Sequence, residues 1–159
     1  MPITPLHLGL GATVKIIAPH KFSFLIFAGT QVLMDIEPLL GIIFKWDTLH
    51  FYSHNLMGAL LIGMFAIFIG KPISEFTLKR ILKKSDWQIS WKVASLSAFI
   101  GSFSHVLFDG LMHTDMYPFF PLSTTQTLST LVPYTYIFYT CLASFIIAGI
   151  GFLMRRSSD

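Results

Sequence analysis

The sequence predicts an all-α integral membrane protein, a helical bundle of four to five transmembrane segments with one amphipathic helix at the cytoplasmic face. The composition is the first observation behind this prediction, because 53% of the 159 residues are hydrophobic and only 12% are charged. A soluble domain carries about 25% charged residues. So few charges cannot cover a globular surface in water, and we therefore expect lipid to be the solvent. The second observation is a set of apolar runs that approach the roughly 20 residues an α-helix needs to cross a bilayer.

Four of these runs are expected to be spans. A fifth run, at the N-terminus, contains Lys15 together with glycines and prolines, and we expect it either to be a short span or to re-enter the membrane. No internal repeat is visible, so residues 1–159 are expected to form a single membrane domain. The expected segments are 3–19, 22–44, 54–70, 91–113 and 131–154, with a cytoplasmic loop at 71–90 and an outer loop at 114–130.

The distribution of lysine and arginine predicts the orientation, because basic residues concentrate on the cytoplasmic side of short loops. Basic residues gather before the second run, between the third and fourth, and after the last, whereas the opposite side has only Lys45. We therefore expect a multi-pass protein of the cell membrane, plasma or bacterial inner, with its N-terminus outside and its C-terminus in the cytoplasm. The basic residues on the predicted cytoplasmic side are Lys15, Lys21, Lys71, Lys79, Arg80, Lys83, Lys84, Lys92, Arg155 and Arg156.

The stretch "ISEFTLKRILKK" in the cytoplasmic loop has the pattern of an interfacial helix. Its apolar residues share one broad side and its basic residues share the other. Such a helix lies on an anionic leaflet, where each basic residue adds about 1 kcal/mol of attraction. Anionic lipid is therefore the expected partner of this face, and nucleic acid is not.

Several ionisable residues lie inside the apolar runs, where each costs roughly 2.5–3.5 kcal/mol on insertion. At 1.5 Å per residue, Asp35 and His105 lie roughly 20 Å and 21 Å from the cytoplasmic ends of their runs, and His7 lies roughly 18 Å from the end of its own. His54 opens the third run from the outside. Separate segments therefore place these residues at one level, in the outer half of the membrane.

The spacing of these residues adds a second constraint. His105 and Asp109 are four residues apart, as are His50 and His54, so each pair shares one face of a helix. Any one of these histidines could simply form a hydrogen bond with a neighbouring helix. The coincidence of depth favours a shared site instead.

Asp35 and Glu37 flank a turn that Pro38 is expected to distort. Neutral imidazoles and carboxylates are ligands that zinc accepts, and a bound dication would neutralise the buried carboxylates. The predicted metal ligands are His7, Asp35, His50, His54, His105 and Asp109, and the sequence leaves open which of His50 and His54 reaches the ion. His113 and Asp115 are expected to be solvated loop residues at the outer rim.

The same residues carry a resemblance to a known family. The stretches "MPITPLHLG", "DIEP", "SHN", "SHVLFD" and "YPFFPLS" occur in this order over nearly the whole chain. In this respect the chain resembles the YdjM-like family of LexA-regulated, membrane-bound predicted metal-dependent hydrolases. That family is in turn distantly similar to zinc-dependent phospholipase C and P1-type nucleases, helical enzymes that hold metal with His-x3-Asp pairs.

The resemblance implies one or two zinc ions, a membrane-embedded hydrolase and a phosphoester substrate, which we expect to be a membrane lipid. In such a hydrolase we expect a carboxylate that does not bind the metal, Asp35 or Glu37, to act as the general base. The residues that match the family's ligand pattern are His105 with Asp109, Asp35 with His50 or His54, and His7 as an early histidine.

Two other classes of function remain open from the residues alone. A metal-ion or proton transporter would use the same cluster as a transient site, although no inverted repeat is visible and no polar residues continue into the inner halves of the runs. A small scaffold protein would use its histidines and acids only to hold its helices together.

Overall fold

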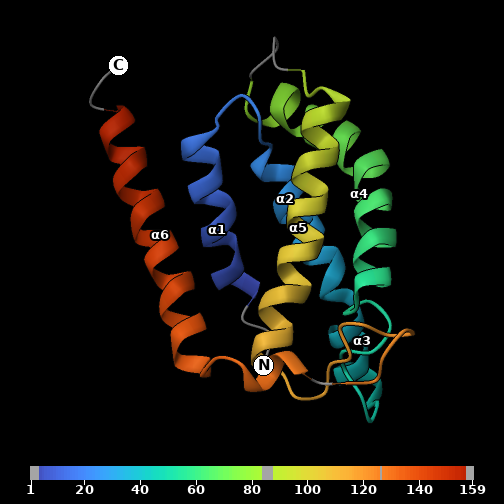
Figure 1. Cartoon of the computed structure of the whole chain (residues 1–159). Helices are drawn as coiled ribbons and strands as arrows, with labels where there is room; N and C mark the ends of the chain where they lie inside the picture. Colours follow the sequence, from blue (N-terminus) through green and yellow to red (C-terminus); the bar gives the residue numbers. More distant parts are fainter. Residues whose placement is uncertain (1–3, 84–87, 126, 157–159) are drawn as a thin grey trace.

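The chain folds into a bundle of roughly parallel and antiparallel α-helices (Figure 1). This computed structural model describes residues 4–83, 88–125 and 127–156, and no β-strand occurs among them. The helices are α1 (Thr4–Ile17), α2 (Phe24–Met34), α3 (Ile36–Phe44), α4 (Leu56–Phe76), α5 (Trp91–Met112) and α6 (Tyr134–Arg156), with a π-helical turn η1 (Thr77–Ile81) after α4 and a 3-10 turn η2 (Thr127–Thr130) before α6.

Four helical segments are long and apolar enough to cross a membrane, and they agree with the four long runs expected from the sequence. They are Phe24–Phe44, Leu56–Ile81, Trp91–Met112 and Tyr134–Arg155. Large apolar side chains on their outer faces are exposed, as for Phe65 on α4 and Ile146 on α6. An apolar surface of this extent suits lipid rather than water. The prediction of a helical membrane bundle is therefore confirmed.

The first long span is two helices rather than one, because the chain bends at Asp35. Asp35 has φ −77° and ψ −4°, and it ends α2 and precedes α3. Pro38 lies in the first turn of α3, where its missing N–H breaks no helical hydrogen bond. Asp35 thus separates α2 from α3, and its side chain faces His105 of α5, 3.4 Å away.

The next helix, α4, continues beyond the predicted end of its span at residue 70 and passes through Pro72. An ion pair supports this extension, since Lys71 Nζ lies 2.8 Å from Glu75 Oε1, and the same oxygen accepts a hydrogen bond from the backbone N–H of Ile89. The amphipathic stretch expected within 71–90 is helical as far as Ile81, but it prolongs α4 instead of forming a separate helix. Lys84, part of that stretch, lies outside the described residues.

The first of the five predicted segments, 3–19, forms α1. At 14 residues, α1 is about 21 Å long and does not reach across the roughly 30 Å of a hydrocarbon core. It lies between α2 and α6 (Figure 1). Gly9 allows α1 to approach the backbone of α6 closely, because a Cβ atom there would lie 2.9 Å from the carbonyl oxygen of Cys141 and 3.0 Å from the backbone nitrogen of Phe145.

The two ends of the bundle differ in charge. The turn after α1, the connection from α4 to α5 and the end of α6 lie at one end, and α3 lies at the other (Figure 1). The first end therefore carries the basic residues counted from the sequence, such as Lys21, Lys71 and Arg155, whereas Lys45 at the end of α3 lies opposite. This arrangement agrees with the charge bias on which the predicted orientation rests, and the orientation itself stays a prediction.

The contact of α1 with α6 leads to a first prediction. Replacing Gly9 with alanine should lower the free energy of unfolding by about 1–3 kcal/mol, because the added methyl group meets fixed backbone atoms. Gly29→Ala is the matched control, since no atom outside its own helix neighbourhood lies within 4 Å of a Cβ there. Thermal unfolding of both variants in detergent measures the difference, and equal stability of the two would contradict this packing.

Candidate metal centre

One face of α5 supplies the framework of the site. His105 and Asp109 lie one turn apart on this helix, and both are buried against the neighbouring helices. Asp35 enters from the bend between α2 and α3, and His54 enters from the segment just before α4. Three separate parts of the chain therefore meet at one point, near the end of the bundle that holds α3.

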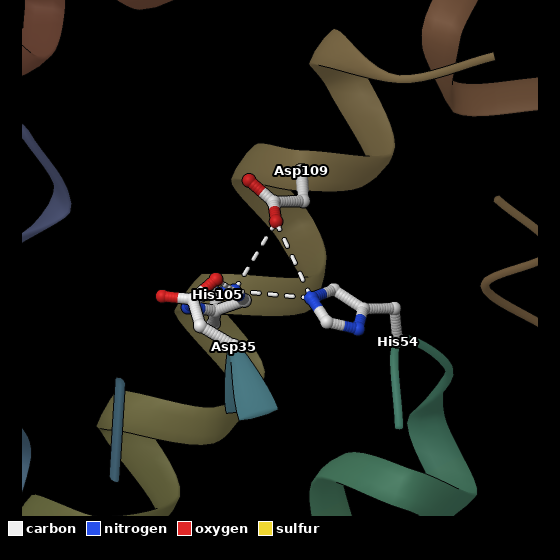
Figure 2. A group of neighbouring side chains, drawn as sticks. All are labelled: Asp35, His54, His105 and Asp109. Atoms are coloured by element: carbon white, nitrogen blue, oxygen red, sulfur yellow. Dashed lines mark hydrogen bonds and ion pairs between the residues drawn. The ribbon is translucent and has the colours of Figure 1, made fainter. Parts of the chain in front are cut away.

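Four side-chain atoms converge there (Figure 2). His54 Nε2 lies 3.2 Å from His105 Nε2 and 3.5 Å from Asp109 Oδ2. His105 Nε2 lies 3.1 Å from Asp109 Oδ2 and 3.4 Å from Asp35 Oδ1. The two histidine side chains have no exposed surface, whereas Asp35 retains 20% and is the most accessible member of the group.

These separations match those between the ligands of a tetrahedral zinc ion. Zinc binds imidazole nitrogen at about 2.0–2.1 Å, so two such ligands at the tetrahedral angle lie about 3.3–3.4 Å apart. Four of the six separations within the group lie between 3.1 and 3.5 Å, and one ligand atom of each residue lies within 4.8 Å of the others. The spacing of His54, His105 and Asp109 in particular is close to that of zinc ligands.

The tautomer of His105 is set by Gln31, a residue of α2. The Gln31 Nε2 amide donates to the carbonyl oxygen of Gly101, 3.2 Å away, so the other end of the amide, Oε1, faces His105 Nδ1 within hydrogen-bonding distance. An amide oxygen only accepts, and Nδ1 must therefore carry the proton. In the neutral imidazole, Nε2 then presents its lone pair to the cluster.

The tautomer of His54 is set by Ser53 in the same way. The Ser53 hydroxyl contacts two groups that only accept, the Glu37 carboxylate and the carbonyl oxygen of Met34. Its single proton is used there, so its oxygen accepts from His54 Nδ1, 2.8 Å away. The Nε2 atom of His54 is again the unprotonated nitrogen, and histidines that bind metal are commonly held in this manner through their second ring nitrogen.

Glu37 therefore contributes to the site indirectly, through the segment that carries His54. Its carboxylate accepts hydrogen bonds from the backbone N–H groups of Phe51, Tyr52 and Ser53, and it lies 3.6 Å from His54 Nδ1. These contacts fix the segment that carries His54. The structure thus separates the predicted acidic pair, because Asp35 points into the cluster whereas Glu37 lies outside it.

His7 approaches the site from α1. Its Nε2 atom lies 3.6 Å from Asp109 Oδ1, the carboxylate oxygen that faces away from the group of four. The side chain is only 1% exposed, and among the residues that the structure describes neither ring nitrogen has a hydrogen-bond partner. A buried polar atom without a partner costs about 1–3 kcal/mol, a cost that a bound ligand would remove at His7.

A second group of possible ligands lies beside the first and shares Asp109 with it. His50, His113 and Asp109 bring one potential ligand atom each within 4.8 Å of the others. The rings of His50 and His113 stack with centroids 4.5 Å apart, and His50 Nδ1 lies 2.9 Å from Asp115 Oδ2. Burial raises the pKa of the Asp115 carboxyl, but the hydrogen bond and the charge interaction with His50, together with a backbone hydrogen bond and the nearby His113, outweigh burial and lower it.

The expectation of a solvated rim at His113 and Asp115 is therefore corrected. Both are partly buried and contact His50, because the segment after α5 folds back over the end of the bundle.

The geometry also distinguishes His50 from His54, a choice that the sequence left open. His54 joins the group of four, and His50 joins the second group.

Comparisons with known proteins identified no similar protein. No family model, no curated protein and no solved structure matches this chain. The resemblance to membrane-bound hydrolases stays a prediction.

The role of Gln31 gives a prediction about metal affinity, which does not depend on the reaction that the protein catalyses. Gln31→Ala removes the acceptor that holds His105 Nδ1, and loss of such a partner typically weakens metal binding 10–100-fold. Competition of the purified protein with a zinc chelator measures this affinity. Gln88→Ala, the same change at an exposed position of the opposite end, is the control and should leave affinity unchanged. Equal affinity of the two variants would remove Gln31 from the site.

Proposed function

We propose that this chain is a membrane-embedded, zinc-dependent hydrolase that acts on a phosphoester. The observation that carries the proposal is the convergence of His54 Nε2, His105 Nε2 and Asp109 Oδ2, 3.1–3.5 Å apart, with the Asp35 carboxylate beside them inside an apolar bundle. The resemblance in sequence supports the choice of reaction. The geometry supports the choice of residues.

His54, His105 and Asp109 are the proposed protein ligands of the ion. They form a set of two histidines and one carboxylate, which is a common set in catalytic zinc sites, where the fourth position is left for water or substrate. When bound, zinc in such a site lowers the pKa of its water to about 7 and polarises a phosphoryl oxygen. A second ion would share Asp109 and take His50 and His113 as further ligands.

Asp35 is the proposed general base. It is the most exposed carboxylate of the cluster, and its Oδ1 lies 3.4 Å from His105 Nε2, beside the proposed open position. From there it can accept a proton from an attacking water and return it to the leaving group. Glu37 is less suited to this task because its oxygens already accept three backbone N–H groups and the Ser53 hydroxyl.

In the predicted orientation, the site belongs to the outer half of the membrane. The cluster lies near the end of the bundle opposite the basic connections (Figure 1). A substrate would then reach it from the outer leaflet or the outer solution. The transporter alternative lacks support here, since no second cluster of metal-ligating residues continues toward the basic end among the described residues.

The proposal predicts that variants of the metal ligands lose bound zinc, whereas a variant of the general base keeps zinc and loses activity. His105→Ala and Asp109→Ala should abolish bound zinc, whereas Asp35→Asn should retain zinc and lose about 10²–10⁴-fold in the rate of phosphodiester hydrolysis. Elemental analysis of the purified protein and a chromogenic phosphodiester assay give the two measurements.

His20→Ala is the control for this series, because His20 is an exposed histidine at the basic end of the bundle. It should keep both zinc and activity. Wild-type protein that purifies without metal and takes up none on dialysis against zinc would contradict the proposal and favour the scaffold alternative.

A further inference from the structure

The hydrogen bond between His50 and Asp115 repeats a pattern found in the group of four. There, the Nδ1 atoms of His105 and His54 each face an oxygen atom from outside the group. His50 Nδ1 likewise faces Asp115 Oδ2, 2.9 Å away. A carboxylate is a common partner for the second ring nitrogen of a histidine that binds metal.

This hydrogen bond sets the tautomer of His50. A carboxylate oxygen only accepts, so His50 Nδ1 carries the proton and donates it to Asp115. In the neutral imidazole, Nε2 then keeps its lone pair. The nitrogen left for a cation at the second group is therefore His50 Nε2.

Backbone contacts fix both sides of this hydrogen bond, which joins residues 65 positions apart in the chain. On one side, the backbone N–H of Phe51, the residue after His50, donates to Glu37 Oε1, 3.1 Å away. On the other side, the carbonyl oxygen of Pro118 accepts from the backbone N–H of Leu56, 2.9 Å away. The segment after α5 is thus tied to the start of α4, and its carboxylate is held beside the imidazole.

The second ring of this group, that of His113, is arranged differently. It stacks on the ring of His50, with centroids 4.5 Å apart and planes inclined by 18°. The lone pair of an imidazole nitrogen lies in the plane of its ring, so two nearly parallel rings cannot address one ion until one of them turns. The rings of His54 and His105 are already inclined by 64°. Because Asp115 restrains His50, His113 is the ring that turns.

We infer that Asp115 is a positioning residue for metal binding, which holds His50 ready for a second ion shared with Asp109 and His113 and thereby sets the affinity of that ion alone. The inference rests on the proposed function for the presence of metal, and on the hydrogen bond to His50 for the role of Asp115. The second ion binds more weakly than the first, because His113 has to leave its stack. It also exchanges more readily, since the Asp115 side chain is 40% exposed whereas the histidine side chains of the group of four have no exposed surface.

Stepwise zinc titration of metal-free protein in detergent, read by competition with a zinc chelator, tests this role. Wild-type protein should bind two ions with separable affinities. Asp115→Ala should weaken the second step about 10–100-fold, the usual effect of losing such a partner, and leave the first step unchanged. Asp115→Asn keeps an acceptor oxygen for His50 Nδ1 and should restore much of the second affinity.

Asp47→Asn is the matched control, because Asp47 is an exposed carboxylate of the same connection between α3 and α4 and belongs to neither group. It should bind both ions as wild type does. His50→Ala removes the ligand itself and should abolish the second step while keeping the first, so it serves as the second variant should Asp115→Ala fail to fold.

NMR of the histidine ring nitrogens in metal-free protein reads the tautomers directly. The signals should show His50 protonated at Nδ1, and Asp115→Ala should change this tautomer while His54 and His105 keep theirs. An unchanged His50 tautomer in Asp115→Ala would overturn the inference.

The titration also keeps this inference apart from the proposed hydrolase. Equal weakening of both steps in Asp115→Ala would show a merely structural role and overturn the inference, as would an unchanged second step. Wild-type protein that binds a single ion, with the same affinity in Asp115→Ala, would contradict the inference and leave the hydrolase intact. Protein that binds no zinc at all would contradict both.

Discussion

Two imidazoles and two carboxylates that face one another inside an apolar bundle require positive charge among them. The hydrogen bonds that Gln31 and Ser53 form with the two histidines strengthen this requirement. Gln31 and Ser53 hold the protons of His105 and His54 on the far side of each ring, so the near side offers only acceptors. Such a group is costly in a medium of low dielectric unless a cation binds or the rings take up protons. A single divalent cation bound between these side chains would supply the positive charge, and the observed separations suit its coordination.

The bundle and the site depend on one another. The four converging side chains come from three separate parts of the chain, and the helices that bring them together are packed through small residues such as Gly63, Ala59 and Gly101. The turn at Asp35 interrupts the first long span between α2 and α3, and the Asp35 carboxylate faces His105, 3.4 Å away. The fold and the candidate metal site thus follow from a single arrangement of α2 to α5.

Much of this arrangement could be predicted from the sequence, because span length, charge bias and depth in the membrane follow from the position of each residue along the chain. They predicted the four long helices and the meeting of His7, Asp35, His54, His105 and Asp109. The parts that escaped prediction depend on three-dimensional contacts. Gln31 lies one turn before Asp35 but reads as an ordinary polar residue until its amide is seen between Gly101 and His105. His113 continues the spacing of His105 and Asp109, and only the fold of the following segment over the bundle end shows that it is partly buried.

An anomalous-difference map collected at the zinc absorption edge, from crystals of protein purified without added chelator, tests the central claim most directly. The account predicts one strong peak about 2.0–2.2 Å from His54 Nε2, His105 Nε2 and an oxygen of Asp109. A second, weaker peak between Asp109, His50 and His113 would agree with a shared carboxylate. An ordered cluster with no peak, or peaks confined to surface histidines such as His20, would contradict it.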